Sequence, residues 1–471
     1  MARGVLEPSA VARVVIAGAG ISGLALARAL RGRGIETLVL ETEPRAGGNI
    51  RSDRVDGHLC EWGPAGLPAD HPDVARLVRA LDLEGRLVRA MPAARRRCLA
   101  LGGTLHAVPS SPGGMLRWPA LSARAKLRAL CDLVLPRGPA ARGEDESVGA
   151  FARRRLGAVA AERLFYPLVS GMYAGDAEQI SLPAALPRLA ELEREHRSLL
   201  LGLARSRGRG LAQSAGALAS FSGGVEDLTR ALAADLGGAL RLAMTVRRVD
   251  KGPGGFRLRV EERGRLDVID ADAVVLAMPA HAAAPAVAAL DGAAVAALEA
   301  IPYVPVTLVH LGWDDSALGH PPDAYGFLVP TREPMRVLGG VFASAVFPGR
   351  APEGHALVSL RVGGARRPEL AALPDDDLVA LCRADVEPLI GAVAPPSFVR
   401  VVRHRRALPQ YTLGHRERIA ALDAAEVRHA GLYFAGNAYR GLGIPDCVRN
   451  AETLADRIAR AESSPNRRLS A

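Results

Sequence analysis

The sequence predicts an α/β protein in which a Rossmann-like dinucleotide-binding domain is joined to a mixed α/β domain and an inserted helical domain. Three observations lead to this fold class. A strand, a glycine-rich turn and a helix are expected in residues 13–30, and a strand, a glycine-rich loop and a helix again in residues 431–461. Residues 77–200 are mainly helical in pattern, and residues 283–397 mix strands with helices. The 471 residues exceed one compact core, so two or three domains are expected.

The N-terminal unit is typical of a dinucleotide-binding fold. Residues 14–17 form a short apolar run, Gly18, Gly20 and Gly23 form G-x-G-x-x-G, and the next residues have helical spacing. In this context the glycines allow a tight turn, a close approach of pyrophosphate to the backbone, and close helix–strand packing. The next predicted strand ends at Glu41, where a carboxylate can accept hydrogen bonds from an adenosine ribose.

Two further stretches favour FAD over NAD. Glu41 leads into residues 44–48, PRAGG, a loop able to lie beside a bound pyrophosphate, and no second G-x-G-x-x-G is present for a nicotinamide cofactor. The C-terminal strand ends at residues 435–437, and Asp446 is expected to cap a helix whose positive end faces the intervening loop. A flavin pyrimidine edge placed there gains stabilisation of the negative charge that develops on reduction.

Composition narrows the other functions. The net charge is +10, but only Lys126 and Lys251 are lysines, a bias that genome base composition explains, so no nucleic-acid binding is predicted. The five cysteines form no C-x-x-C pair, so neither a disulfide framework nor a metal site is predicted. The N-terminus lacks the apolar core of a signal peptide, and prolines interrupt the apolar run 273–290, so no transmembrane helix is predicted.

Several stretches carry a resemblance to a known family. They are E-x-x-P-R-x-G-G at 41–48, GMYAGDAEQIS at 171–181, EREHRSLLLG at 193–202, YGFLVP at 325–330, LPQYTLGH at 408–415 and GLGIPDCVRN at 441–450. With the fingerprint, they resemble the oxygen-dependent protoporphyrinogen oxidases, within the superfamily of flavin monoamine oxidases and phytoene desaturases. The resemblance spans essentially the whole chain and preserves the order of the motifs.

The resemblance implies three domains and an activity. The FAD-binding domain would comprise residues 1–70, 220–282 and 398–471, the substrate-binding domain 71–96 and 283–397, and a helical domain associating with one membrane leaflet 97–219. The activity would be the six-electron oxidation of protoporphyrinogen IX to protoporphyrin IX in haem biosynthesis. Molecular oxygen would be the oxidant, and three rounds would release three molecules of hydrogen peroxide.

The family's contacts carry over residue by residue. The implied FAD contacts are Gly18, Ala19, Gly20, Ile21, Ser22, Gly23, Glu41, Asn49, Gly63, Pro64, Ala65, Gly66, Val246, Asn437, Leu442, Gly443 and Ile444. The implied substrate contacts are Arg97, Gly171, Tyr325, Leu328 and Arg361. No catalytic side chain is implied, because flavin N5 performs the chemistry; the Gly171 carbonyl would approach the ring N–H groups. Two positions depart from the family: many relatives have a polar or charged residue at Ala65, and methionine is common at Arg361.

Several alternatives stay open at this stage. Coproporphyrinogen III, with four propionates rather than two, is the nearest rival substrate, and Arg361 leaves it open. An amine oxidase would have a lysine near flavin N5, and a carotenoid desaturase would have a longer apolar tunnel without an arginine anchor. A non-catalytic binding module of the same fold, such as a Rab-escort protein, is disfavoured by the intact fingerprints at both ends of the chain.

The expected partners follow from the same resemblance. They are a porphyrinogen, molecular oxygen and the lipid of the inner face of the cell membrane, with the protein otherwise cytoplasmic. Homodimerisation and transfer of the product to a metal-inserting chelatase are further expectations. Arg97 is expected to bind a propionate because a guanidinium presents a planar fork of donors. The second cationic run, residues 153–155, is expected to face lipid headgroups.

Overall fold

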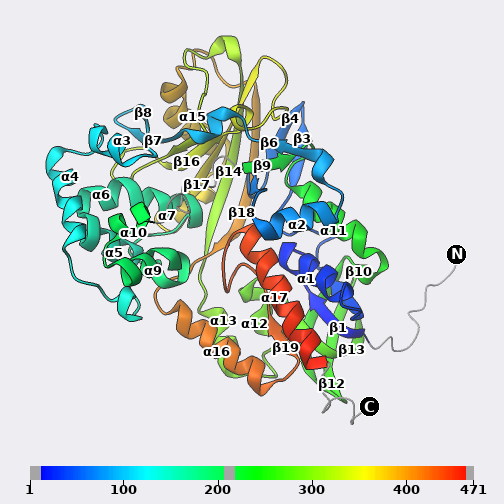
Figure 1. Ribbon diagram of the computed structural model, residues 1–471. Coiled ribbons are helices and arrows are strands. Elements are labelled where there is room, and N and C mark those ends of the chain that lie inside the picture. Colours follow the sequence, from blue (N-terminus) through cyan, green and yellow to red (C-terminus); the bar gives the residue numbers. More distant parts are fainter. Residues whose placement is uncertain (1–11, 206–217, 463–471) are drawn as a thin grey trace.

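The structure, a computed structural model, describes residues 12–205 and 218–462. Two seven-stranded sheets form its centre, and a group of helices lies beside them at the left of Figure 1. The predicted loop at 204–220 falls mostly outside the described residues, as does the predicted tail after residue 463.

The first sheet belongs to the predicted FAD-binding domain. Its strands, in spatial order, are β10 (Leu240–Arg241), β2 (Thr37–Leu40), β1 (Ala12–Ala17), β13 (Arg265–Leu276), β12 (Gly255–Glu262) and β11 (Met244–Gly252). A further strand, β19 (Leu432–Phe434), pairs with β13 beyond the point where β12 ends. The strands β10, β2, β1, β13 and β19 run parallel, whereas β11, β12 and β13 form an antiparallel meander. The strands predicted on either side of the fingerprint are thus confirmed.

Alternation along β1 explains how this sheet is covered on both faces. Val14 and Ile16 pack on one side, against α1 (Ile21–Arg31), α11 (Glu226–Leu236) and α17 (Ile444–Glu462). Val15 and Ala17 pack on the other side, against the meander and against α12 (Ala280–Ala286), α13 (Gly292–Glu299) and α16 (His415–Arg428). Helices α1 and α17, from opposite ends of the chain, lie side by side in Figure 1.

The second sheet is mostly antiparallel. Its strands, in spatial order, are β18 (Phe398–Pro409), β14 (Tyr303–Asp314), β17 (His355–Gly363), β16 (Val337–Phe342), β15 (Gly326–Leu328), β7 (Arg97–Leu101) and β8 (Thr104–Ala107). Residues 309, 311 and 313 of β14 pack with α15 (Asp375–Ile390) in one core. Since successive side chains of a strand point to opposite faces, residues 308 and 310 face away from α15. They line the cavity described below.

Two predicted domain boundaries do not coincide with the sheets. Residues 97–107, placed in the helical domain, form β7 and β8 of the second sheet, and β7 pairs with β15 in parallel. Strand β18, placed in the FAD-binding domain, pairs with β14 along most of its length. Neither pairing leaves a local signal in the sequence, because both partners are distant in the chain.

The remaining elements complete the molecule. The helical group contains α3 (Pro112–Arg117), α4 (Ala123–Leu130), α5 (Val148–Leu156), α6 (Ala158–Ala160), a π-helical turn (Ala161–Phe165), α7 (Tyr166–Tyr173), α8 (Leu182–Ala185), α9 (Pro187–His196) and α10 (Leu199–Arg205). The others are α2 (Pro72–Ala80), α14 (Ala343–Val346), the hairpin β3 (Ser52–Val55) and β4 (His58–Glu61), and the small sheet of β5 (Leu67–Pro68), β9 (Leu218–Phe221) and β6 (Leu87–Arg89). Among residues 12–205 and 218–462, no helix is both long and apolar enough to cross a membrane.

The arginine run at 153–155 does not face lipid as expected. Arg155 is fully buried, and its Nε lies 2.6 Å from Asp132. Arg154 donates to Glu146 and Glu193, at 2.8 and 2.7 Å. Only Arg153 is exposed. The run belongs to a buried ion network that holds α5 and α9 together, because buried charges persist only when they are paired.

Candidate active site

Each glycine of the fingerprint has a different structural role in the turn between β1 and α1. Gly18 has φ of +111°, and a Cβ there would lie 2.7 Å from the Ala277 carbonyl oxygen. A Cβ on Gly23 would lie 2.0 Å from the Gly18 carbonyl oxygen, whereas a Cβ on Gly20 would have no atom within 4 Å. Helix α1 begins at Ile21 without a side-chain cap. The middle glycine therefore leaves room at an uncapped helix N-terminus, where a phosphate group fits.

Glu41 lies directly beside this turn, as predicted. One carboxylate oxygen accepts from the backbone N–H of Ala19 at 2.7 Å, and the other accepts from that of Glu43 at 2.9 Å. Strand β11 is attached to the same residue, because the N–H of Met244 donates to the Glu41 carbonyl at 2.8 Å. Val246, whose backbone the resemblance assigns to the adenine, lies two residues farther along the same strand.

A second glycine loop lies against the first turn. The backbone N–H of Gly47 donates to the Ala19 carbonyl at 2.8 Å, and the Arg45 guanidinium donates to the Gly48 carbonyl at 2.6 Å. Asn49 donates to the Ala407 carbonyl at 3.3 Å, which joins this loop to the end of β18. The loop predicted to lie beside a pyrophosphate therefore does lie beside the fingerprint.

The C-terminal loop between β19 and α17 is held by Tyr411, a residue not singled out from the sequence. Its hydroxyl donates to the Asn437 carbonyl at 2.7 Å and accepts from the Gly441 N–H at 2.9 Å. His415 stacks on the Tyr411 ring at 4.1 Å, and burial lowers its pKa to about 4. The only sequence signal was the quoted motif LPQYTLGH, which contains both residues. Helix α17 begins at Ile444, so Asp446 lies within its first turn rather than at its cap.

These segments together fit FAD. The predicted FAD contacts lie in the β1–α1 turn (residues 18–23), after β2 (Glu41), in the second glycine loop (Asn49), between β4 and β5 (residues 63–66), in β11 (Val246) and between β19 and α17 (Asn437 and residues 442–444). The open space at Gly20, the uncapped helix and the carboxylate of Glu41 are the features that the pyrophosphate and ribose of a dinucleotide require.

A cavity of about 460 Å³ joins the predicted cofactor and substrate residues. Its lining includes Arg97, Gly171, Tyr325, Leu328 and Arg361, and also the residues 63–66 from the predicted flavin side. All five predicted substrate residues are thus in one place, although they come from β7, α7, the segment before β15, β15 and β17. The lining also includes Arg163, Glu61, His310, Arg350 and Ser359, which the sequence did not single out.

The outer part of the cavity is built around Tyr325. The Arg97 guanidinium carbon lies 5.3 Å from the centre of the Tyr325 ring, and Arg97 is exposed. Within the described residues it forms no ion pair, whereas its neighbour Arg96 pairs with Asp323 at 2.6 Å. A Cβ on Gly171 would lie 2.7 Å from Leu328 Cδ2, so the glycine allows α7 to approach β15 closely.

Arg361 lies deeper than Arg97. Its Nη1 donates to the Gly171 carbonyl at 2.6 Å, and its strand neighbour on β14 is Leu308. Burial lowers the pKa of this arginine, and the nearby Tyr325 opposes that shift. The Gly171 carbonyl, which the resemblance assigns to the ring N–H groups, already accepts a hydrogen bond from Arg361.

The inner end of the cavity carries polar groups that are largely satisfied. Burial raises the pKa of Glu61 to about 7, against the opposing effect of Arg350, whose Nη2 lies 3.5 Å from the carboxylate. Ser52 and the Val225 N–H also donate to Glu61. His310 is fully buried, contacts the Ser359 hydroxyl through Nδ1 at 2.8 Å, and has its pKa lowered to about 4 by burial.

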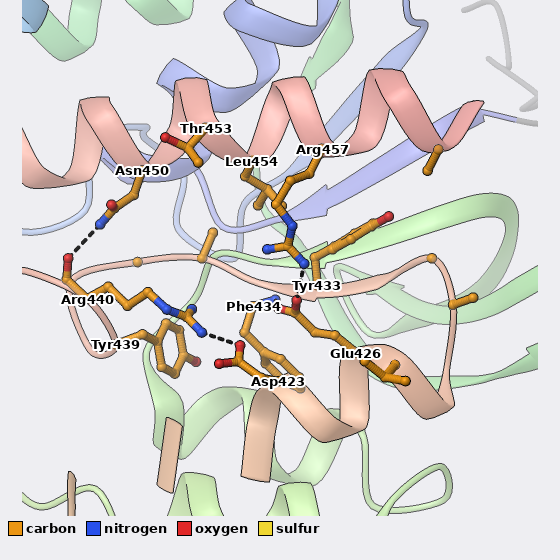
Figure 2. Close-up of a pocket in the computed structure, with 16 residues that line it drawn as sticks. Asp423, Glu426, Tyr433, Phe434, Tyr439, Arg440, Asn450, Thr453, Leu454 and Arg457 are labelled. Carbon is orange, nitrogen blue, oxygen red and sulfur yellow. Dashed lines mark hydrogen bonds and ion pairs between the residues drawn. The ribbon is translucent and has the colours of Figure 1, made fainter. Parts of the chain in front are cut away.

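A second, larger pocket of about 830 Å³ lies between α16, β19 and α17, on the outside of the FAD-binding domain. Figure 2 shows Arg457 of α17 pointing to Glu426 of α16, at 2.7 Å, and Arg440 pointing to Asp423. The charged groups of this pocket are paired with one another, and none of the predicted site residues lines it. The smaller cavity therefore has the chemistry of an active site, and the larger pocket does not.

Comparison with known proteins shows which family the chain belongs to. Residues 21–459 match the family of flavin containing amine oxidoreductases. The chain is 34% identical to the coproporphyrinogen III oxidase of Propionibacterium freudenreichii subsp. freudenreichii, over 96% of this chain and 93% of that protein. It is 33% identical to the protoporphyrinogen oxidase of Bos taurus, over 95% and 98% respectively.

A solved structure extends the comparison to the fold. The structure of a protein from Exiguobacterium sp. 255-15, named provisionally as a protoporphyrinogen oxidase, superimposes with a TM-score of 0.82 at 26% identity. It covers 96% of this chain and 100% of that chain. With a family match over nearly the whole length and a glycine-lined site that fits the cofactor, the chain belongs to the flavin containing amine oxidoreductases and is an FAD-dependent oxidoreductase.

Proposed function

We propose that the chain oxidises protoporphyrinogen IX to protoporphyrin IX, using FAD and molecular oxygen. One observation carries this proposal: a single cavity has apolar and aromatic walls, residues 63–66 of the FAD side at its edge, and guanidinium groups without carboxylate partners within the described residues. Apolar walls suit a tetrapyrrole, and free guanidinium groups suit its propionates. The protoporphyrinogen oxidase of Bos taurus, which is similar over nearly its whole length, supports the same substrate.

The chain's own residues position the macrocycle in this proposal. Arg97 binds a propionate at the exposed rim, while Tyr325 and Leu328 contact the faces of the ring. When bound, FAD supplies hydride acceptance from a meso carbon and the transfer of the electrons to oxygen. Burial keeps His310 neutral, so it adds no positive charge beside Arg361 and Arg350.

The proposed activity is tested by mixing the purified, FAD-loaded protein with protoporphyrinogen IX in air. Protoporphyrin fluorescence should rise faster with the enzyme than in buffer alone, and about three hydrogen peroxide molecules should form per porphyrin, as the resemblance implies. A protein that carries FAD but oxidises no porphyrinogen above the rate in buffer would contradict the proposal.

Coproporphyrinogen III is a second candidate substrate, favoured by a specific observation. The cavity is lined by four arginines and by only one acid, Glu61. This excess of positive charge is more than the two carboxylates of protoporphyrinogen need, and it suits a substrate with four. The relative from Propionibacterium freudenreichii is named for this substrate. Parallel measurement of kcat/KM on the two porphyrinogens ranks them directly.

We further propose that the helical group binds the inner face of the cell membrane peripherally. Half of the large, exposed apolar side chains in the described residues lie in this group: Leu116, Leu127, Leu130, Leu133, Val134, Val159, Met172 and Leu203. Arginines lie between them, as in residues 121–135, which suits anionic lipid.

The membrane proposal is tested with lipid vesicles. The full chain should sediment with anionic vesicles at low salt, and Leu127→Asp should weaken this binding. A chain that ignores such vesicles would contradict the proposal. Homodimerisation and product transfer to a chelatase stay predictions.

A further inference from the structure

We propose that Arg361 is a second carboxylate-binding position in the cavity, and that it decides how well the chain accepts a porphyrinogen with more than two carboxylates. This inference rests on the proposed function and deepens it. Arg97 lies at the exposed rim, whereas Arg361 lies on β17 beneath Gly171 and Tyr325. A porphyrinogen has its carboxylates around its edge, so two separated guanidinium groups can bind two different propionates of one molecule.

The surroundings of Arg361 leave its charge uncompensated. Within the described part of the chain, no carboxylate lies within ion-pair distance of Arg361, and its guanidinium forms one hydrogen bond, to the Gly171 carbonyl. A neutral carbonyl satisfies one of the five N–H donors of an arginine and supplies no negative charge. Burial has already lowered the pKa of this group, so the surroundings disfavour its charge. A bound carboxylate would supply both the charge and the missing acceptors.

The charges that line the whole cavity also indicate that it binds a substrate with several carboxylates. Of the four arginines that line it, Arg350 has a partner in Glu61 at 3.5 Å. Arg97, Arg163 and Arg361 form no ion pair in residues 12–205 and 218–462. A dicarboxylate can neutralise two of these three groups, and a tetracarboxylate can neutralise all of them.

The consequence is selection by the group that faces Arg361. A propionate there would pair with the guanidinium, whereas an uncharged substituent would shield it from water and leave it without a partner. A site built to bind a polar group discriminates against an analogue that lacks it, because its own polar atoms are then left unsatisfied. Replacing Arg361 by methionine, an uncharged side chain of similar length, should therefore move the preference toward the dicarboxylate.

The experiment measures kcat/KM of the FAD-loaded wild type, Arg361→Met and Arg361→Lys on coproporphyrinogen III and on protoporphyrinogen IX. Arg361→Met should lower the coproporphyrinogen to protoporphyrinogen ratio by about ten- to hundredfold, the range of one charge-assisted hydrogen-bonded pair. Arg361→Lys should recover part of the ratio. Arg366→Met, an exposed arginine outside the cavity, is the matched control and should keep the wild-type ratio.

A binding measurement separates carboxylate recognition from a general loss of fold. Coproporphyrin III and its tetramethyl ester are titrated against each variant by porphyrin fluorescence, with Tm and FAD content measured on the same samples. The wild type should prefer the free acid, and Arg361→Met should lose about the same factor of that preference as it loses in the kcat/KM ratio.

Each outcome is informative. An unchanged substrate ratio, or an equal loss on both substrates with an unchanged preference for the acid over the ester, overturns the role of Arg361. The proposed function survives that result as long as the wild type oxidises a porphyrinogen. A wild type that binds FAD but oxidises neither substrate overturns the proposed function, and this inference with it.

Discussion

The FAD site and the substrate cavity are built in different ways from the same chain. The candidate FAD site consists mainly of backbone: the turn at Gly18 to Gly23, the loop at Gly47 and Gly48, and the loop after β19, with Glu41 as the principal side chain. The cavity instead consists mainly of side chains from β7, β14, β15 and β17 of the second sheet and from α7 of the helical group. Changes in the first region should therefore act on cofactor and fold, and changes in the second on turnover with FAD in place.

The largest effect on stability and FAD binding is expected in the glycine fingerprint, where one glycine is needed for packing and another for contact with the cofactor. Gly23→Ala places a Cβ 2.0 Å from the Gly18 carbonyl, where only backbone can yield, so the variant should lose FAD and much of its stability. Gly20→Ala meets no protein atom within 4 Å and should fold normally while binding FAD more weakly. Flavin absorbance after purification and Tm measure the two losses separately. Equal Tm losses in both variants would contradict the distinction.

The next largest effect is expected on kcat/KM, from a substitution in the cavity that does not change FAD binding. Arg97→Ala removes the proposed charge-assisted hydrogen bond to a propionate, worth about 1.5–3 kcal/mol, so kcat/KM should fall by about one to two orders of magnitude. Arg97→Lys should recover part of the loss, because a point charge lacks the fork of a guanidinium. FAD content should be unchanged.

The neighbouring arginine gives a matched control for this change. Arg96 pairs with the exposed Asp323, and exposed ion pairs contribute at most about 1 kcal/mol to stability. Arg96→Ala should therefore leave kcat/KM near the wild-type value. An Arg97→Ala variant with full FAD and near-normal kcat/KM would remove Arg97 from the site.

The contrast between a site of local backbone turns and a cavity assembled from distant segments explains how much could be predicted from sequence. The fingerprint and Glu41 were predictable because strand, turn and helix follow one another within a few tens of residues. The resemblance to a known family implied five substrate contacts, of which Gly171, Tyr325 and Leu328 lie in quoted motifs. The structure brings all five residues to one cavity, and their contact with substrate stays a prediction. The roles of Glu61 and Arg350 could not be predicted, because their pairing joins residues nearly three hundred positions apart.

The arginine run at 153–155 shows the physical reason most clearly. As a sequence, three adjacent arginines resemble a solvated face, since exposure is the usual state of this residue. In the structure, Arg155 is fully buried against Asp132, and Arg154 pairs with Glu193. Ion pairs between distant residues have no periodicity, so nothing in the local sequence distinguishes a buried arginine from an exposed one.

A smaller effect is expected at Glu41, the principal side chain of the candidate FAD site. Glu41→Ala loses hydrogen bonds to the ribose, each worth about 0.5–1.5 kcal/mol net, so the dissociation constant for FAD should rise by about tenfold. Glu43→Ala is the control, because Glu43 contacts Glu41 through its backbone N–H, which the substitution keeps. Fluorescence titration of the apoprotein with FAD measures both. Equal affinity in Glu41→Ala and wild type would contradict the ribose contact.

The last expected effect concerns stability rather than cofactor binding or turnover, and it follows from Glu61, at the inner end of the cavity. Its pKa is raised from the ordinary 4.5 to about 7 by burial, so between these values the folded chain holds a proton that the unfolded chain has released. The free energy of unfolding therefore falls as the pH rises through this window, by at most about 3.5 kcal/mol at about 1.4 kcal/mol per pKa unit.

Glu61→Gln removes this dependence, because an amide does not titrate. The variant leaves Arg350 without an acid, but that cost is the same at every pH in the window, since arginine stays charged. The Tm of the variant should therefore improve relative to wild type by a few degrees between pH 5 and pH 8, whichever protein is more stable at pH 5. Glu84→Gln, at an exposed position, should follow the wild-type profile. A constant difference in Tm between Glu61→Gln and wild type would show that Glu61 is already ionised at pH 5, and that the inner end of the cavity carries a permanent negative charge.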